Sequence, residues 1–379
     1  MNVYLDYAAA TPLDDLVTAA MQPFFSELFY NPSAEYSQAR LVNQHVQQAR
    51  SLVAQHIGAK PAEIFFVAGG SEANNLVING IMQRYKQAKL VISAIEHESV
   101  REPSQQYDHS VVNVDKKGVI LIDDLRERID DATVLLSIMY VNNEVGTIQP
   151  IKAIAQYVEK VRKERQTNGN NLPLYFHVDA CQAAAYEDLH LRAKGVDLVT
   201  LNGGKIYGPK QSGAVFVRAG IELVPQIVGG GHENGLRSGT LNVANIIGFA
   251  KALDVVQSRR TKESQRLKSL QTYFIGQLEA SEFLCKVNGD LKKRLPNNVH
   301  TTFFNQDNER LLYLLDEQGI MCSRGSACMA SKQEPSYVLG AMGLSDEEIR
   351  ASLRFSMGVA TTKDNIDYAI SVLRGILKK

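Results

Sequence analysis

The chain has 379 residues, with 41 basic and 41 acidic side chains and a formal net charge of zero. At about 150 residues per domain this length predicts two domains, and a composition with 45% hydrophobic and 22% charged residues excludes a disordered chain. The charge balance argues against a nucleic-acid partner, which requires a basic excess. The four cysteines form no Cys-x-x-Cys pair and the histidines lack ligand spacing, so we expect neither a metal site nor a disulfide framework.

The sequence also lacks the patterns of export and membrane insertion. The N-terminal residues show no basic segment followed by an apolar stretch, and no apolar run is long enough to span a bilayer. We therefore expect a cytoplasmic protein without a membrane partner.

The first two thirds of the chain alternates short apolar runs with helical periodicity. Runs rich in β-branched residues predict strands at residues 64–67, 90–94, 111–114, 134–139, 174–178, 198–201 and 214–217. Between them, residues 151–161 carry the i, i+3, i+4, i+7 apolar stripe of an amphipathic helix. Buried strands separated by crossover helices predict an α/β fold with a mostly parallel sheet, whose ligands bind beyond the carboxyl ends of the strands.

After about residue 250 the pattern changes to that of a smaller α+β domain. The predicted elements are a long charged helix at 251–280, strands at 299–304, 319–321 and 352–355, and helices at 309–318 and 363–378. We place the domain boundary within the long helix. Residues 13–252 are expected to form the large domain, and residues 1–12 and 253–379 the small one.

A possible anion site follows the first predicted strand. Residues 66–75 pass from the strand through two glycines into a helix that is expected to begin at Ser71. Free backbone N–H groups and the helix dipole favour a phosphate there, although a serine that simply caps the helix is the alternative. Nucleotide-binding motifs do not fit, because Lys205 is not followed by serine or threonine and residues 229–235 do not match the dinucleotide fingerprint.

Three other positions carry candidate chemistry. Asp179 ends an apolar strand, where it could hold a cationic partner or cap a helix. Lys205 lies in a Gly-Gly turn, where it could form an imine or be a solvated loop lysine. Cys328 lies among small residues, as an accessible loop thiol or a small core residue, whereas the other three cysteines are interpreted as structural. A phosphate site, a strand-end acid and an imine-forming lysine are together what pyridoxal 5′-phosphate requires.

Ordered blocks along nearly the whole chain then point to one family. These blocks are residues 4–12, 31–33, 141–146, 177–182, 205–210, 229–240, 324–328, 334–339 and 353–356. Together they resemble the cysteine desulfurases of the class-V aminotransferase group. The Gly-Ser-Ala-Cys block followed by Glu-Pro-Ser resembles the subgroup with a long catalytic loop, which serves iron–sulfur cluster assembly or tRNA thiolation. The resemblance implies the pyridoxal-phosphate-dependent transferase fold type I, with a seven-stranded, mostly parallel sheet in the large domain and the catalytic cysteine loop in the small one.

The resemblance also assigns contacts around the cofactor ring. Lys205 matches the lysine that binds the cofactor covalently, and Asp179 matches the acid that pairs with the pyridine nitrogen. Gln182 matches the donor to the ring hydroxyl, and Asn143 another contact beside the ring. His97 matches the histidine that stacks on the ring and serves as an acid/base group.

Further matches concern the cofactor phosphate. Gly70 and Ser71 match the phosphate-binding helix start, and Thr240 matches a phosphate contact that the partner subunit supplies, which implies a homodimer. The sequence departs from the family at 202–204, where Asn-Gly-Gly replaces the usual Ser-Gly-His. An amide at Asn202 thus takes the place of a phosphate-binding hydroxyl.

The remaining matches concern the substrate. Arg354 matches the arginine that binds the substrate carboxylate, with assistance from Asn31, and Cys328 matches the nucleophile. Tyr140 replaces a histidine that is usual in the family. The implied reaction converts L-cysteine into L-alanine and a persulfide on Cys328, which is passed to an acceptor such as an iron–sulfur scaffold or a tRNA thiolation enzyme. The alternatives are a selenocysteine lyase or aminotransferase of the same fold, and a non-catalytic interaction module.

Overall fold

A large mixed sheet forms the centre of the molecule in the computed structural model, which describes residues 2–325 and 335–377. Its strands, in spatial order, are β2 (Ile64–Val67), β8 (Gly213–Val217), β7 (Leu198–Asn202), β6 (Tyr175–Asp179), β5 (Thr133–Ser137), β3 (Lys89–Ser93) and β4 (His109–Val112). From β7 to β4 all neighbours are parallel, whereas β8 is antiparallel to both β7 and β2. The predicted α/β fold with a mostly parallel sheet is therefore confirmed, and each predicted run lies within about two residues of a strand.

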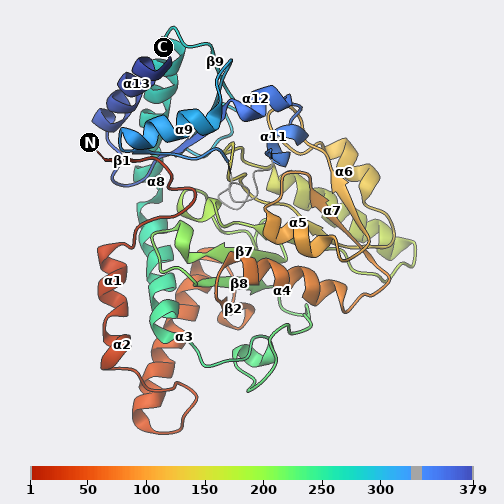
Figure 1. The fold of residues 1–379 in the computed structure, drawn as a ribbon. Coiled ribbons are helices and arrows are strands. Elements are labelled where there is room, and N and C mark those ends of the chain that lie inside the picture. The colour runs from red at the N-terminus through yellow and green to blue at the C-terminus, as the bar shows by residue number, and fades with distance from the viewer. Residues whose placement is uncertain (1, 326–334, 378–379) are drawn as a thin grey trace.

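Helices cover both faces of this large sheet (Figure 1). They are α1 (Asp15–Met21), α2 (Pro23–Ser26), α3 (Ser37–Ile57), α4 (Gly70–Met82), α5 (Glu98–Ser104), α6 (Ile122–Arg128) and α7 (Ile151–Thr167). On β5, Leu135 packs in one apolar cluster with α4, and the next residue, Leu136, packs in another with α3 and α7. Alternate strand residues thus meet apolar helices on both sides, which explains the continuous apolar runs in the sequence.

A second, smaller sheet lies in the C-terminal third of the chain. It is antiparallel and contains β12 (Ser352–Ser356), β10 (Asn298–Phe303) and β9 (Cys285–Val287), in that order. The accompanying helices are α9 (Asn308–Glu317), α11 (Tyr337–Ala341), α12 (Asp346–Arg350) and α13 (Lys363–Leu377). Near the N-terminus, β1 (Val3–Tyr4) pairs in parallel with β11 (Ile320–Met321), so the N-terminal segment is joined to the C-terminal third of the chain. The sequence analysis missed β9, whose three residues are too few to show a period.

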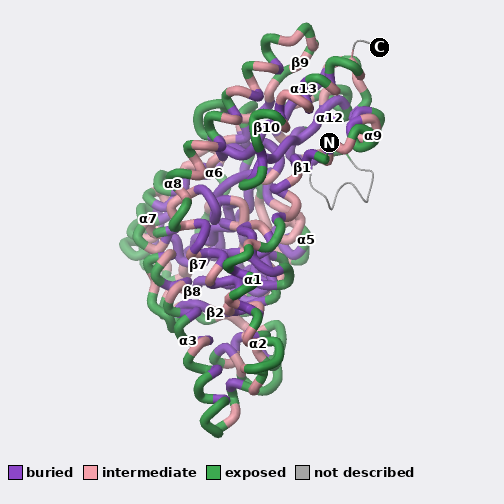
Figure 2. Tube along the Cα trace, turned by 90° about the vertical axis from the view of Figure 1, so that its left-hand side faces the viewer, coloured by how far each residue is buried: buried purple, intermediate pink, exposed green. Residues whose placement is uncertain are grey.

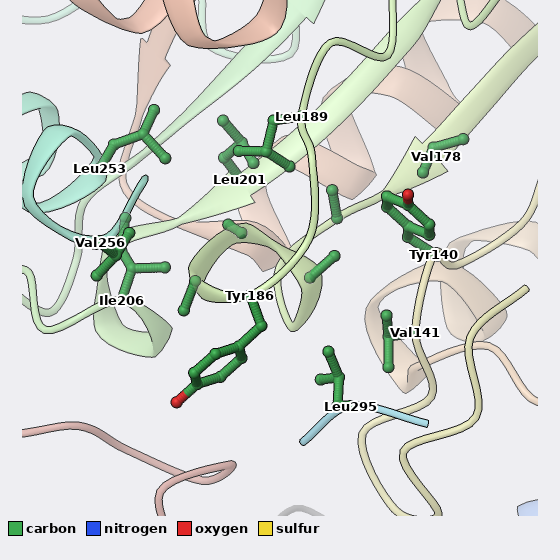
Figure 3. Packing of buried hydrophobic residues seen from close by; sticks show 14 of the residues in the cluster. Tyr140, Val141, Val178, Tyr186, Leu189, Leu201, Ile206, Leu253, Val256 and Leu295 are labelled. Carbon is green, nitrogen blue, oxygen red and sulfur yellow. The ribbon is translucent and has the colours of Figure 1, made fainter. Parts of the chain in front are cut away.

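One long helix links the two sheets. Helix α8 (Val243–Glu279) starts before the predicted 251–280 stretch and passes without a break through residue 252. It contacts α1 and α3 along one half and α13 and β10 along the other (Figure 1). Figure 3 shows its Leu253 and Val256 in the same packed cluster as Val178 and Leu201 of the large sheet.

The buried residues lie where the sheets and helices pack against one another. Figure 2 shows buried residues concentrated along the strands and exposed residues on the outer helices and connecting loops. Within residues 2–325 and 335–377, no helix combines the length and the apolar character needed to cross a membrane.

Candidate active site

A pocket opens at the carboxyl edge of the large sheet, where the sequence analysis expects ligands to bind. It is lined by residues from the segments that follow several of the parallel strands, from the loop after β1, and by one residue of β12. The lining residues are Ala8, Ala9, Gly70, Ser71, Asn74, His97, Ser99, Met139, Val141, Asn143, Asp179, Cys181, Gln182, Asn202, Lys205 and Arg354. Candidates that lie up to 284 positions apart in sequence (Gly70 and Arg354) therefore converge in one place.

Asp179, at the end of β6, is almost completely buried in the wall of this pocket. Its Oδ2 accepts a hydrogen bond from Nδ2 of Asn74 at 2.8 Å, and its Oδ1 accepts one from the backbone N–H of Cys181 at 2.9 Å. The second bond fixes the turn after β6, but the 3₁₀ helix that follows is capped at Gln182, so the alternative in which Asp179 caps a helix is wrong. The first bond orients the carboxylate, and its pairing with a cationic partner stays a prediction.

Lys205 follows β7 in a single 3₁₀ turn and is half-buried, which excludes a fully solvated loop lysine. Its Nζ donates hydrogen bonds to the carbonyl oxygens of Ala8 at 3.1 Å and Ala9 at 2.5 Å. Gln182 donates from Nε2 to the same Ala8 oxygen at 2.9 Å. The loop after β1 thus holds both side chains at the pocket wall.

The anion site expected from the sequence lies at the start of α4. Gly69 has a φ of 136°, which favours glycine. A Cβ at Gly70 would lie 2.9 Å from Sγ of Cys181 and 3.4 Å from Nδ2 of Asn202, so only glycine fits beside these neighbours. Asn202 accepts the backbone N–H of Gly204 through Oδ1 and turns its Nδ2 donor toward the helix start. Asn202 therefore presents an amide donor beside the start of α4.

Arg354 comes to the pocket from the small sheet. Its side chain on β12 is 1% exposed, so Arg354 is not a surface arginine. Nη2 pairs with Oδ1 of Asp6 at 2.6 Å, and Nη1 donates to the carbonyl of Asn143 at 3.0 Å. Within the described part of the chain, its Nε is buried without a hydrogen-bond partner. A buried guanidinium with a spare donor is suited to a carboxylate ligand.

His97 and Ser99 line the side of the pocket that follows β3. Nδ1 of His97 lies 2.8 Å from Oγ of Ser99 and accepts the backbone N–H of Ser99 at 3.1 Å. Burial lowers the pKa of His97, which favours the neutral ring. Sequence reasoning missed Ser99 and Asn74. The signal for Asn74 is its position one turn into α4, on the face that the helix turns toward the sheet.

Cys181 was interpreted as structural, yet it lines the pocket. Burial and the neighbouring Asp179 raise the pKa of its thiol well above the usual range. Cys181 is therefore held as a neutral thiol, which is a poor nucleophile.

Several expected site residues lie elsewhere. Asn31 and Thr240 are exposed and are not among the lining residues of the described chain. Tyr140 is buried, with its hydroxyl 3.5 Å from Nζ of Lys194, and it does not line the pocket. Cys328 lies in 326–334, outside the described residues.

The chain on either side of residues 326–334 lies beside the pocket. Ser323 pairs with Arg354 by a β-bridge, and Oγ of Ser336 donates to Oε2 of Glu144 at 2.6 Å. A Cβ at Gly325 would lie 3.1 Å from the same Glu144 oxygen. Both flanks of the segment that carries Cys328 therefore meet at Glu144, a residue that the sequence analysis did not single out.

The donor set fits pyridoxal 5′-phosphate. Lys205 supplies an amine, Asp179 a buried anion and the start of α4 a cradle that excludes any Cβ at Gly70, each at the wall of the same pocket. In the part of the chain that the structure describes, no group of three or more histidine, cysteine or acidic side chains is placed to hold a metal ion.

Comparison with known proteins agrees with the family resemblance of the sequence. Residues 3–369 match the family model described as aminotransferase class-V. The chain is 39% identical to cysteine desulfurase IscS of Dictyoglomus turgidum and 37% identical to that of Methanosarcina thermophila, covering 100% of this chain and 95% and 92% of the relatives. A solved NifS-like protein, 30% identical, superposes with a TM-score of 0.91 over 100% of both chains. Proteins of this family depend on pyridoxal 5′-phosphate, and the chain belongs to the cysteine desulfurases of the class-V aminotransferase family.

Proposed function

We propose that this protein converts L-cysteine into L-alanine and retains the sulfur as a persulfide on Cys328. The observation that carries the proposal is the convergence of Lys205, Asp179 and Arg354 on one pocket. These residues supply an amine, an anion and a carboxylate-binding group, and no two of them are close in sequence. The relatives named cysteine desulfurase, which match over the whole chain, support the same reaction.

The residues of the pocket have different roles in this reaction. When bound, pyridoxal 5′-phosphate withdraws electron density from the α-carbon of the amino acid. Asp179 keeps the pyridine nitrogen protonated, while the start of α4 and Asn202 hold the phosphate. Arg354 binds the substrate carboxylate and so orients the thiol side of the substrate toward the chain that flanks Cys328. Lys205 binds the cofactor and moves protons at the α-carbon.

The sulfur step needs no outside oxidant. The thiolate of Cys328 attacks the substrate sulfur, so that an S–S bond forms while the Cβ–S bond breaks. The electron pair of the broken bond stays with the carbon skeleton, which gains a proton and leaves as alanine. Cysteine and a thiol have then become alanine and a persulfide, with atoms and electrons balanced.

The test is incubation of the full-length protein with L-cysteine, followed by mass analysis. We expect alanine and one additional sulfur atom on Cys328. Cys328→Ser should keep the bound cofactor and give no persulfide, whereas Cys181→Ser and Cys285→Ser, as matched thiol controls, should still give one. Normal sulfur release by Cys328→Ser would contradict the proposal and favour another reaction of the same fold.

We also propose that the active form is a homodimer in which Thr240 reaches the phosphate site of the partner subunit. Thr240 is exposed, and the segment before it exposes Ile227 and Val228 by 41% and 79%. Glu233 anchors this segment through a buried ion pair with Arg50 at 2.6 Å. If the protein sediments as a monomer at micromolar concentration, or if Thr240→Ala binds the cofactor as tightly as the wild type, this arrangement is wrong.

We also propose a division into two domains and a class of sulfur acceptor. Residues 13–252 would form the cofactor-binding domain, and residues 1–12 and 253–379 the domain that carries Arg354 and Cys328. The sulfur acceptor would be an iron–sulfur scaffold or a tRNA thiolation enzyme in the cytoplasm. The relatives named cysteine desulfurase IscS support an acceptor in iron–sulfur assembly.

A further inference from the structure

Four polar side chains form a continuous hydrogen-bonded chain along the pocket wall. Asp179 accepts from Nδ2 of Asn74 at 2.8 Å, the same Nδ2 lies 2.9 Å from Oγ of Ser99, and this Oγ lies 2.8 Å from Nδ1 of His97. All four residues line the pocket. The chain thus connects two groups for which the family resemblance implies separate roles.

The direction of the bonds at His97 follows from the donors. The backbone N–H of Ser99 points at Nδ1 from 3.1 Å, and an N–H can only donate. Nδ1 must therefore be unprotonated. Because an unprotonated Nδ1 cannot donate, the hydroxyl of Ser99 must give its hydrogen to the same nitrogen.

The direction at Asn74 is equally determined. With its hydrogen directed at His97, Oγ of Ser99 can only accept from Asn74. An amide has two N–H hydrogens, and here one goes to Ser99 and the other to Asp179. A reversed amide would place its oxygen against the carboxylate of Asp179. Oδ1 of Asn74 instead has no hydrogen-bond partner in the described part of the chain.

These directions leave one state for the His97 ring. A neutral imidazole carries one ring proton, which here must lie on Nε2. A second proton could bind only at Nδ1, where it would displace two hydrogen bonds. The charged groups that face the ring are Asp179 from β6, Lys205 after β7 and Glu98 on α5, and burial outweighs them in lowering the pKa of His97.

We propose that Asn74 and Ser99 are positioning residues that hold His97 as a neutral imidazole with its proton on Nε2, and that His97 donates a hydrogen bond into the pocket without transferring protons. This inference rests on the proposed function and refines it. A ring with Nε2 protonated and Nδ1 blocked has no free site that accepts a proton. The acid/base role expected from the family then does not belong to His97, and Lys205 carries the proton transfers.

The first test is NMR of the full-length protein labelled with ¹⁵N at its eight histidines, with the His97→Gln spectrum used for assignment. Spectra are recorded with and without pyridoxal 5′-phosphate between pH 6 and 9. We expect one protonated and one unprotonated ring nitrogen for His97 throughout this range. Protonation of both nitrogens near pH 6.5, or a proton on Nδ1, would overturn the proposal.

Two variants test the positioning residues. Asn74→Asp removes the amide donor, so the Ser99 hydroxyl can turn to the new carboxylate, and the Nδ1 signal of His97 should shift. Ser99→Ala should shift it too, and Ser99→Thr should restore it. Asn75→Asp adds the same charge on the neighbouring residue, whose amide bonds outward to Ser71, and is the matched control. An unchanged His97 signal in both Asn74→Asp and Ser99→Ala would contradict the assignment.

Kinetics supply an independent measure. Glutamine can donate a hydrogen bond but cannot transfer a proton, so His97→Gln should retain kcat within about tenfold. Loss of a true acid/base group costs about 10²–10⁴-fold, and a loss of that size would refute the proposal. Alanine formation by the wild type tests the proposed function separately, because the NMR readout needs no substrate. An active enzyme whose His97 titrates near pH 6.5 disproves only this inference.

Discussion

The two sheets of this protein bury their polar side chains in different ways. In the large sheet, His177 on β6 is fully buried and uses both ring nitrogens, with Oγ of Ser137 at 2.8 Å and Oγ1 of Thr200 at 3.0 Å. In the small sheet, His300 on β10 is equally buried, but only Nδ1 has a partner, Nδ2 of Asn288 at 3.1 Å. Its Nε2 has none among the described residues.

The difference extends beyond these two histidines. Further buried polar atoms near β10 lack a hydrogen-bond partner within the described residues, on Arg294, Asn297, Asn298 and Thr301. Buried polar groups are normally satisfied, by ordered water where the protein offers no partner. His300 lies directly opposite Arg354 in the sheet register. Apart from Oδ1 of Asn74, the polar side chains around Asp179 and His177 are thus held by direct bonds, whereas several buried polar atoms behind Arg354 have no protein partner among the described residues.

The largest effect should come from the cofactor side. Lys205→Ala removes the amine that we propose binds the cofactor, and we expect turnover to fall by more than about 10³-fold, as for other covalent catalytic groups. The visible absorbance of the protein–cofactor adduct should disappear as well. Absorbance spectra and alanine production measure the two losses.

Lys210→Ala is the matched control. Nζ of Lys210 also donates to a backbone carbonyl of the N-terminal loop, that of Thr11 at 2.6 Å, but Lys210 does not line the pocket. This variant should keep both absorbance and turnover. Wild-type absorbance in Lys205→Ala would show that the amine is elsewhere.

A smaller effect is expected on the other side of the pocket. Arg354→Lys keeps the positive charge beside Asp6 but loses the planar fork that binds a carboxylate at two points, so kcat/KM for L-cysteine should fall about 10²-fold, mainly through KM. Cofactor absorbance should be unchanged, which separates this side from that of Lys205. Arg350→Lys, on the exposed end of α12, is the control and should keep the wild-type KM. An unchanged KM in Arg354→Lys would remove Arg354 from substrate binding.

Much of the cofactor side could be predicted from the sequence alone. Asp179 and Lys205 directly follow apolar runs, and the carboxyl ends of parallel strands meet at one edge of a sheet. Their convergence therefore follows from the fold class. The start of α4 could be placed in the same way, from Gly-Gly after a strand.

Three other residues of the pocket could not be found by these rules. Arg354 looks like any arginine on a short strand, and its burial depends on Asp6, far away in the sequence. Asn74 and Ser99 are equally inconspicuous, because their importance comes from contacts between α4 and the start of α5. Only the family resemblance identified Arg354 before the structure did. The position of Asn74 one turn into α4 becomes informative only once the helix is placed against the sheet, and no sequence signal points to Ser99.

The smallest effect concerns stability in acid and compares the two buried histidines. Burial lowers the pKa of His177 to about 4 and that of His300 to about 3. The pKa of an unfolded histidine is about 6.5, so below that pH the unfolded chain binds protons that the folded chain does not. The free energy of unfolding should therefore fall as the pH drops from 6.5 toward 4, by about 2 kcal/mol for each histidine at pH 5.

Urea unfolding of the wild type, His177→Gln and His300→Gln at pH 7.5 and pH 5 measures this effect. Each substitution should reduce the stability difference between the two pH values by about 2 kcal/mol. At pH 7.5, His177→Gln should lower the free energy of unfolding more than His300→Gln does. The ring of His177 makes two hydrogen bonds worth about 1 kcal/mol each, whereas His300 has only one protein partner among the described residues. Equal costs at pH 7.5 would mean that water satisfies Nε2 of His300 as well as Thr200 satisfies that of His177, and the contrast between the two sheets would then disappear.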